Sequence, residues 1–375
     1  MGEERLRRAS RRDPGPGGLG ALVRRTRDLR LGGSVTLPEF VPGIELARGF
    51  YEDVLAPLLA DTPHAAARLG WGSDVLGFDT ERSTDHGWGP CAQVFVSAED
   101  VAAVAARIDS SLPERYRDWP VRFGWDEVPV RHHVEVSTLE AWLAERLGFD
   151  PLERIETVDW LTVPQQHLLE ATAGAVFHDG LGRLEAARRS LAWYPEDVWL
   201  WLLACGWRRI GQEEAFVGRA AEVGDALGAR IVTARLVREL MRLAFLIERR
   251  YAPYSKWLGS AFRRLEAAAT LDAPLRAALD GDEDGLVEAL EDVARRHNAL
   301  GLTREVEPAA RLFHERPFRV IGGDRFADAC RERIRDPWLR SLPLVGSVDQ
   351  AADSTDVLAY PRRARRLRDL YVPDE

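Results

Sequence analysis

Lysine is almost absent from this chain of 375 residues. Lys256 is its one lysine, and arginine supplies the rest of its 51 basic residues. The two side chains are not interchangeable, because an ammonium group is a compact point charge and a guanidinium group is a planar fork. Either Lys256 stands where a point charge is required, or its uniqueness is a chance result of arginine-rich coding.

Cysteine and long apolar segments are also scarce. The three cysteines, Cys91, Cys205 and Cys330, match no zinc or disulfide spacing. This predicts a protein of the reducing cytoplasm. The longest apolar run begins at Val198 and is too short to cross a bilayer. The N-terminus lacks the apolar stretch of a signal peptide, so we expect a cytoplasmic protein that does not enter a membrane.

The charge of the chain argues against nucleic acid as a partner. Acidic residues number 60, and the formal net charge is −9, which repels a phosphate backbone. The basic stretches at 5–12 and 362–368 are typical of solvated tails and helix faces. No glycine-rich loop ends in Lys-Ser or Lys-Thr, which excludes a P-loop kinase. The sequence contains no indication of the oligomeric state.

Apolar periodicity predicts an α+β fold, with a small mixed-sheet domain followed by a helical bundle. We expect four segments: an Arg/Gly/Pro-rich flexible tail at 1–36 with one short helix around 19–31, an α/β domain at 37–155, a helical bundle on the acceptor side at 156–305, and a C-terminal segment at 306–375 that packs on both domains.

Within the α/β domain, helices are expected at 40–58, from an N-cap at Ser97, and from a cap at Ser137 or Thr138 to Gly148. Strands are expected around 67–71, 92–98 and 131–138. No strand is expected after about residue 155, where the apolar spacing is helical. The expected helices there are 163–176, 182–192, 196–226, 228–250, 254–268 and 283–299.

The stretch GWGSDVLGFDTERSTDHGWG, residues 70–89, contains the residues with the clearest chemistry. A Gly-Ser turn such as Gly72-Ser73 can present backbone N–H groups and a hydroxyl to phosphates. Carboxylates such as Asp85 can hold the metal ions that neutralise a triphosphate during nucleotidyl transfer. The stretch therefore favours a metal-dependent nucleotidyl transfer site.

These residues resemble the signature of the DNA polymerase β-like nucleotidyltransferase superfamily: Gly-Ser, about ten residues, Asp-x-Asp or Asp-x-Glu, and a third carboxylate on a later strand. The helical part, with GQEEAFVGRAAEVGD and ERRYAPYSKWLG, resembles the C-terminal half of the kanamycin-type nucleotidyltransferases. The stretch 40–358 is similar to a bacterial family with the domain of unknown function 4037, through FVPGIELARGFY, GSDVLGFD, STDHGWGP, YAPYSKW and GSVDQAADSTDVL.

The superfamily resemblance implies roles for individual residues. Gly72 and Ser73 would bind a nucleoside triphosphate, Asp85 would hold Mg²⁺ or Mn²⁺, and Glu135 would be a metal ligand or general base. The sequence departs from the signature at Gly87, where the second carboxylate of Asp-x-Asp is expected. Three alternatives stay open: Asp79 or Asp74 supplies the missing ligand, His86 does so, or a single metal that arrives with the triphosphate suffices. Of these residues, Asp79 is our candidate ligand.

Cations of the helical part complete the candidate site. Lys256 follows Pro253-Tyr254 near an expected helix start, from which it could reach a phosphate, and Arg219 could do the same from a helix face. A second Gly-Ser, Gly346-Ser347, precedes Asp349, Asp353 and Asp356 and is the alternative location of the site.

The sequence thus predicts an enzyme that moves a nucleoside monophosphate from a triphosphate to a hydroxyl of a small molecule or protein. The alternative is a nucleotide-binding module of the same fold that has lost catalysis, as Gly87 would suggest. A helical ribonuclease is disfavoured, because no histidine of the helical region follows an arginine by four to six residues.

Overall fold

The computed structural model describes residues 38–126 and 128–372. The chain separates into two compact units, Met1–Phe40 and Val41–Glu375. Every helix and strand of the described residues belongs to the second unit. The expected tail and its short helix lie outside the described residues.

The second unit contains a mixed five-stranded sheet in the order β5-β6-β2-β1-β7. β2 and β6 are parallel, and the other neighbours are antiparallel. Short hairpins pair β3 with β4 and β8 with β9. The strands are β1 (Ala65–Arg68), β2 (Cys91–Phe95), β3 (Arg115–Tyr116), β4 (Trp119–Pro120), β5 (Arg122–Trp125), β6 (Val128–Ser137), β7 (Ala175–Asp179), β8 (Arg311–Leu312) and β9 (Arg319–Val320).

Strands β7, β8 and β9 all lie beyond residue 155 and correct the expectation that strands end there, and β7 joins the main sheet. Strand β7 directly follows helix α7 (Gln165–Thr172). Its first three residues, Ala175-Val176-Phe177, form a short apolar run between Gly174 and Gly180, which is a strand pattern that the predicted helix 163–176 obscured. Gly174 has a φ of +68°, and an added Cβ would lie 2.1 Å from the carbonyl oxygen of Arg68. The glycine therefore permits the chain to turn closely against β1.

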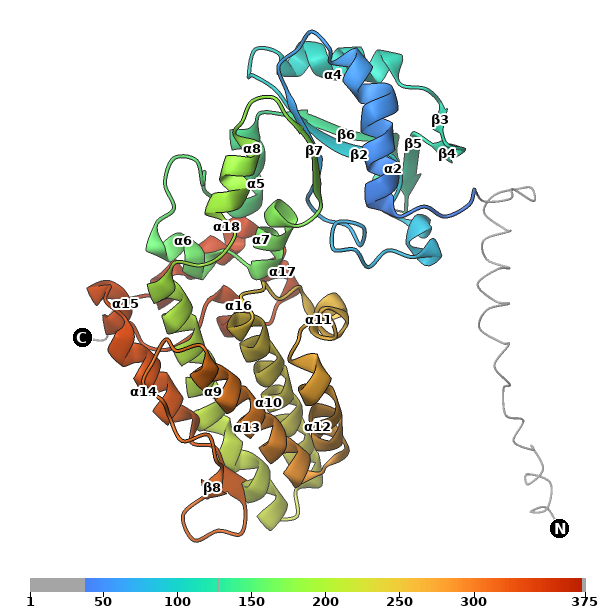
Figure 1. Ribbon diagram of the computed structural model, residues 1–375. Helices are drawn as coiled ribbons and strands as arrows, with labels where there is room; N and C mark the ends of the chain where they lie inside the picture. Colours follow the sequence, from blue (N-terminus) through green and yellow to red (C-terminus); the bar gives the residue numbers. More distant parts are fainter. Residues whose placement is uncertain (1–37, 127, 373–375) are drawn as a thin grey trace, which may run out of the picture. The chain divides into compact units, whose positions relative to one another are not determined.

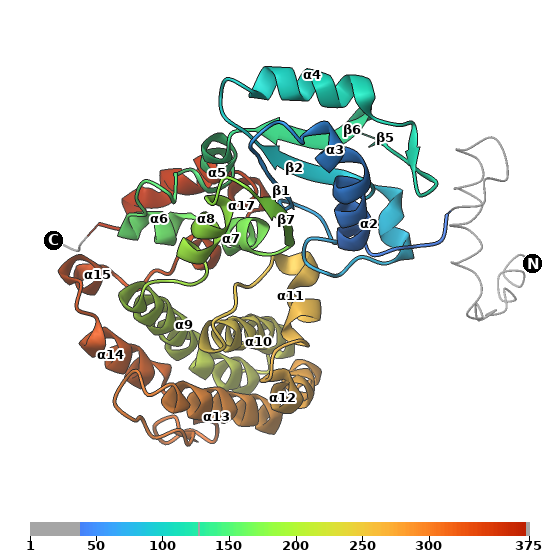
Figure 2. The same cartoon turned by 45° about the horizontal axis from the view of Figure 1, so that its top comes forward.

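Helices of the first part contact the sheet (Figure 2): α2 touches β1 and β2, and α4 touches β6. The prediction for α5 is confirmed, since Thr138 accepts a hydrogen bond from the Ala141 amide and Gly148 ends the helix in the left-handed region. Helix α4 begins later than expected, because Asp100 is its N-cap and Ser97 only hydrogen-bonds to that carboxylate. These helices are α2 (Gly43–Phe50), the π-helix η1 (Tyr51–Leu55), α3 (Ala56–Leu58), the 3₁₀-helix η2 (Glu81–Asp85), α4 (Val101–Ser111) and α5 (Leu139–Leu147).

Long helices dominate the second part, where α9 packs against α10 and α14, and α12 against α13 (Figure 1). Helix α12 was not expected, and Pro274 lies inside it. These helices are α6 (Thr157–Thr162), α7 (Gln165–Thr172), α8 (Leu184–Ser190), α9 (Glu196–Glu222), α10 (Ala226–Ile247), α11 (Ser255–Phe262), α12 (Ala268–Asp280) and α13 (Glu283–Ala299). No helix among the described residues is long and apolar enough to cross a membrane.

The last segment contacts α5 of the first part, through α18, as well as the helices of the second part. Tyr371 donates a hydrogen bond to the carbonyl of Leu161, and α14 begins where Glu214 of α9 accepts the amide protons of residues 321–323. Its helices are α14 (Gly323–Arg333), α15 (Pro337–Ser341), α16 (Val348–Ala351), α17 (Thr355–Leu358), α18 (Pro361–Ala364) and the 3₁₀-helix η3 (Arg365–Leu370).

A buried ion pair shapes the loop that follows β1. Arg68 donates two hydrogen bonds to the Asp74 carboxylate, at 2.7 and 2.9 Å, and also binds the carbonyls of Leu69 and Trp71. The Arg68 and Asp74 side chains are only 5% and 3% exposed. Breaking such a pair leaves an uncompensated charge in the interior.

We therefore expect Asp74→Asn to lower the free energy of unfolding by about 3–5 kcal/mol, measured by urea denaturation. The control is Asp85→Asn, which changes an exposed carboxylate of the same loop and should cost about 0.5 kcal/mol or less. Equal stabilities of the two variants would contradict the role assigned to the ion pair.

Candidate functional site

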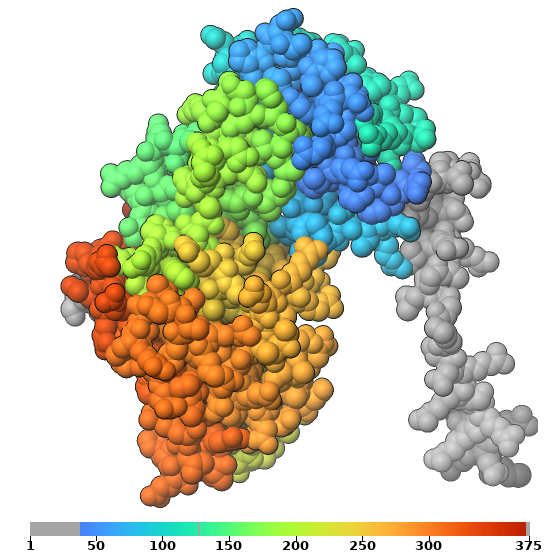
Figure 3. Space-filling view, in the orientation of Figure 1, coloured from blue at the N-terminus to red at the C-terminus, as the bar shows by residue number. Residues whose placement is uncertain are grey.

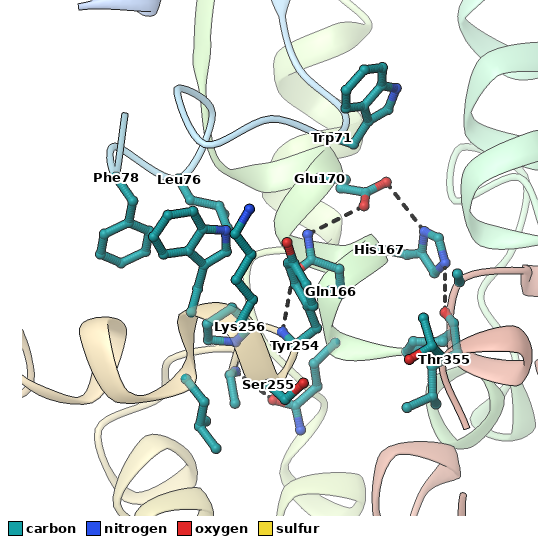
Figure 4. A pocket seen from close by; sticks show the side chains of 18 of the residues that line it. Trp71, Leu76, Phe78, Gln166, His167, Glu170, Tyr254, Ser255, Lys256 and Thr355 are labelled. Atoms are coloured by element: carbon teal, nitrogen blue, oxygen red, sulfur yellow. Dashed lines mark hydrogen bonds and ion pairs between the residues drawn. The ribbon is translucent and has the colours of Figure 1, made fainter. Parts of the chain in front are cut away.

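A cavity of about 880 Å³ lies where five segments meet, and one residue each of α5 (Arg146) and α9 (Leu202) completes its lining. Its walls are the loop between β1 and β2, helix α7, helix α10, the start of α11, and the chain around α16 and α17. Figure 3 shows the loop, in light blue, meeting the segment of α11, in yellow-orange, on one face of the molecule. Figure 4 shows Gln166, His167 and Glu170 of α7 lining the cavity together with Trp71, Tyr254 and Lys256.

The Gly72-Ser73 turn lines this cavity. Gly72 has a φ of +149°, and an added Cβ would lie 2.2 Å from a carboxylate oxygen of Asp74. The Phe78 amide hydrogen-bonds to the Ser73 carbonyl and closes the loop. Glycine at position 72 is thus required by the buried ion pair as well as by any close approach of a ligand.

Asp85 lies at the end of η2 and lines the same cavity. Its carboxylate is 58% exposed, and one oxygen lies 2.7 Å from Nδ1 of His86. His86 also lines the cavity. The two side chains therefore lie together, whereas a strand at this position would have placed them on opposite faces.

The structure gives a steric reason for glycine at position 87. Gly87 has a φ of +64°, and an added Cβ would lie 2.6 Å from the six-membered ring of Trp71. Trp71 is 47% exposed and lines the cavity. Its indole fills the space beside the backbone of Gly87, the position at which the superfamily signature has its second carboxylate.

Asp79 and Asp74, the other two candidate acids of the loop, lie outside the cavity lining and have structural partners. One carboxylate oxygen of Asp79 accepts hydrogen bonds from the Gly43 amide, at the start of α2, and from the Trp88 indole. Asp74 is engaged by Arg68. One oxygen of Asp79, our candidate metal ligand, is therefore engaged at the start of α2, and Asp79 is not among the residues that line the cavity with Asp85.

Glu135 lies on β6 opposite Gln93 and is not among the residues that line the cavity. Its carboxylate accepts a hydrogen bond from the Trp142 indole and lies 3.7 Å from Arg146, which does line the cavity. Among the described residues, no group of three or more His, Cys, Asp or Glu side chains is placed to hold a metal ion.

Of the two candidate cations, only Lys256 lines the cavity that the Gly-Ser turn also lines. Lys256 lines the cavity, and its Nζ lies 5.0 Å from the centre of the Trp257 ring. Arg219 lies on α9 in a separate hollow beside Phe216 and Arg316. The second Gly-Ser does not itself line the cavity: Ser347 is the buried N-cap of α16. Of the acids that follow it, Asp349 and Asp353 are lining residues, whereas Asp356 is not.

Several lining residues were not predicted from the sequence. His167 and Glu170 of α7 are buried and lie 3.3 Å apart, and His167 also contacts the Leu358 carbonyl. The polar run QQHLLE within a buried helix is a signal that could have revealed them. No comparable sequence pattern marks the four arginines that line the cavity, which are Arg82, Arg146, Arg238 and Arg242.

Basic and acidic side chains are nearly balanced in the cavity lining, and some of them pair with each other, as Arg238 does with Asp353. Among the described lining residues, five are arginine or lysine and four are aspartate or glutamate. Burial raises the pKa of Asp349, while Arg242 and the Gln165 amide act in the opposite direction. Cys91 on β2 is buried, which raises the pKa of its thiol to about 12 and makes it a poor nucleophile.

Comparison with known proteins identifies a family for one part of the chain. Residues 160–258 match the family model described as domain of unknown function (DUF4037). The match supports a place in this family and extends from α6 to the start of α11, so it includes Lys256 and the lining residues of α7 and α10. No curated protein and no solved structure matches the chain.

Position 87 offers a direct test of the metal-binding motif. We expect Gly87→Asp and Gly87→Asn each to cost about 1–3 kcal/mol of stability, because both residues must adopt a positive φ and displace Trp71. Only the aspartate adds a charged oxygen ligand. It should therefore bind Mn²⁺ more tightly than the isosteric asparagine in calorimetric titration, and equal affinities would exclude position 87 from the metal site.

Proposed function

We propose that this protein is a metal-dependent nucleotidyltransferase, which moves a nucleoside monophosphate from a nucleoside triphosphate to a hydroxyl of a small molecule or protein. One observation carries the proposal: Gly72-Ser73 and Asp85 of one loop, and Lys256 from a distant part of the sequence, line a single cavity. The resemblance of the Gly-Ser and Asp85 motif to the nucleotidyltransferase signature supports the same conclusion.

In this proposal the cavity residues bind and orient the triphosphate. The Gly72-Ser73 turn presents backbone N–H groups and a hydroxyl to phosphate oxygens, and Lys256 at the start of α11 adds a point charge. The acceptor oxygen attacks the α-phosphorus, and the bond from that phosphorus to the bridging oxygen breaks. The acceptor hydroxyl loses its proton, and pyrophosphate leaves.

The residues present fit one Mg²⁺ better than two. Mg²⁺ prefers oxygen ligands and is often held by one or two carboxylates together with substrate phosphates, a role that the exposed Asp85 carboxylate can fill. A second ion would have no carboxylate ligands here, because position 87 is glycine and the Glu135 carboxylate lies beside Arg146. When bound, the ion would neutralise phosphate charge and polarise the phosphoryl group.

A second candidate function is a nucleotide-binding module without catalysis. The positions of Gly87 and Glu135 favour it, because two of the three carboxylates implied by the superfamily resemblance are missing from the cavity. Binding of a triphosphate without transfer of any part of it would identify this function.

Labelled triphosphates distinguish these functions. Incubation of the full chain with a cell extract and Mg²⁺ should attach label from α-labelled ATP, or another labelled nucleoside triphosphate, to an acceptor. Label from the γ-phosphate should not be retained, because it leaves in pyrophosphate. Retention of γ-label alone would indicate phosphoryl transfer and contradict the proposal, and retention of neither label would favour the binding module.

Two neighbouring carboxylates provide matched variants for this assay. Asp85→Asn should abolish transfer and the Mg²⁺ dependence of triphosphate binding, whereas Glu81→Gln should leave both unchanged. Glu81 lies on the same 3₁₀-helix and is exposed, but it does not line the cavity.

Lys256 tests whether the cavity requires a point charge. We expect Lys256→Arg to weaken triphosphate binding although the charge is kept, because a planar fork needs room for two parallel bonds. Lys256→Ala should weaken it further. If both variants bind triphosphate like the wild type in calorimetric titration, the uniqueness of this lysine reflects coding and not ligand binding.

A further inference from the structure

Arg146 is a mostly buried cation with no hydrogen bond to any described residue. Its side chain is 20% exposed, lies over the Trp142 ring at 5.3 Å and lines the cavity. The nearest carboxylate oxygens belong to Glu135 and Glu170, at 3.7 and 3.8 Å, which is beyond hydrogen-bonding distance. The Nε atom is buried and has no partner.

This arrangement is costly unless a ligand completes it. A guanidinium group has five N–H donors, and burying donors without acceptors is unfavourable by about 1–3 kcal/mol for each unsatisfied group. Arg146 lines the cavity, and the two carboxylates that flank it lie close enough to balance its charge but too far away to accept its hydrogen bonds. The missing acceptors are therefore expected from a bound molecule.

The position of Arg146 indicates which kind of molecule would supply these acceptors. Glu135 is the residue that the superfamily resemblance implies as a metal ligand, and Arg146 places a positive charge between Glu135 and Glu170. A guanidinium group thus stands beside the carboxylate where a second metal ion would be expected. It differs from an ion in being fixed to the chain by α5 and stacked on Trp142.

We propose that Arg146 binds the polyphosphate of the triphosphate substrate and replaces the second metal ion of a two-metal site. The role rests on the proposed function, since it deepens the assignment of the same cavity. A guanidinium fork matches two phosphate oxygens at once. Arginine side chains also stabilise the charge that develops on transferring phosphoryl groups in other enzymes.

Binding of inorganic tripolyphosphate with Mn²⁺ to the full chain tests this directly, without any need for the acceptor. Arg146→Gln should weaken the affinity at least about tenfold, as expected for lost hydrogen bonds to a charged group. Arg146→Lys should recover only part of it, because the charge is kept and the fork is lost. The matched control is Arg219→Gln, an exposed arginine of a separate hollow, which should bind like the wild type.

Glu135→Gln provides a measurement in the opposite direction. The amide oxygen can keep the hydrogen bond from Trp142, while the negative charge near Arg146 is removed. Tripolyphosphate should therefore bind more tightly than to the wild type. If the Glu135–Arg146 pair were merely structural, Glu135→Gln and Arg146→Gln would both bind tripolyphosphate more weakly than the wild type. Both variants would also have a lower melting temperature.

The number of bound metal ions gives an independent readout. One Mn²⁺ per chain is expected in the wild-type complex with tripolyphosphate, counted by electron paramagnetic resonance, and two would overturn the replacement of a metal by Arg146. If Arg146→Gln bound tripolyphosphate with wild-type affinity, the role of Arg146 would be overturned, while the proposed function would stand. Absence of tripolyphosphate binding to the wild type would overturn the proposed function as well.

Discussion

The buried ion pair between Arg68 and Asp74 is the interaction on which the candidate site depends. Arg68 is the last residue of β1, and its guanidinium also binds the carbonyls of Leu69 and Trp71. These bonds fix the course of the chain from the sheet into the Gly72-Ser73 turn. Desolvation of two charges is expensive, so a buried pair of this kind specifies one conformation more than it stabilises the fold.

A second set of contacts fixes the other side of the loop. Phe78 stacks on Trp257 with ring centres 5.0 Å apart, and the Arg264 guanidinium lies 3.8 Å above the Phe78 ring. Arg264 also donates hydrogen bonds to the carbonyls of Leu76 and Gly77. These contacts hold the loop against α11, which carries Lys256. The Gly72-Ser73 turn and Lys256, which are the two candidate phosphate contacts, therefore have a defined separation.

Sequence patterns predicted the local elements better than their assembly. The caps of α5 were readable because Thr138 and Gly148 act within one helix. β7 was missed, because its short apolar run was included in the predicted helix 163–176 and its partner β1 is more than a hundred residues away. The same limit applies to the site. The Gly-Ser motif indicated the loop, but nothing in the sequence around Arg146 shows that Glu135 and Glu170 flank it.

The walls of the cavity extend along the sequence from Trp71 to Ala359. A site of this kind has a high contact order, since its parts meet only after most of the chain has collapsed. During synthesis on the ribosome, the N-terminal segments that line the cavity emerge before the chain around α16 and α17 has been made. Ligand binding therefore cannot assist the folding of the early segments, and it can stabilise only the completed chain.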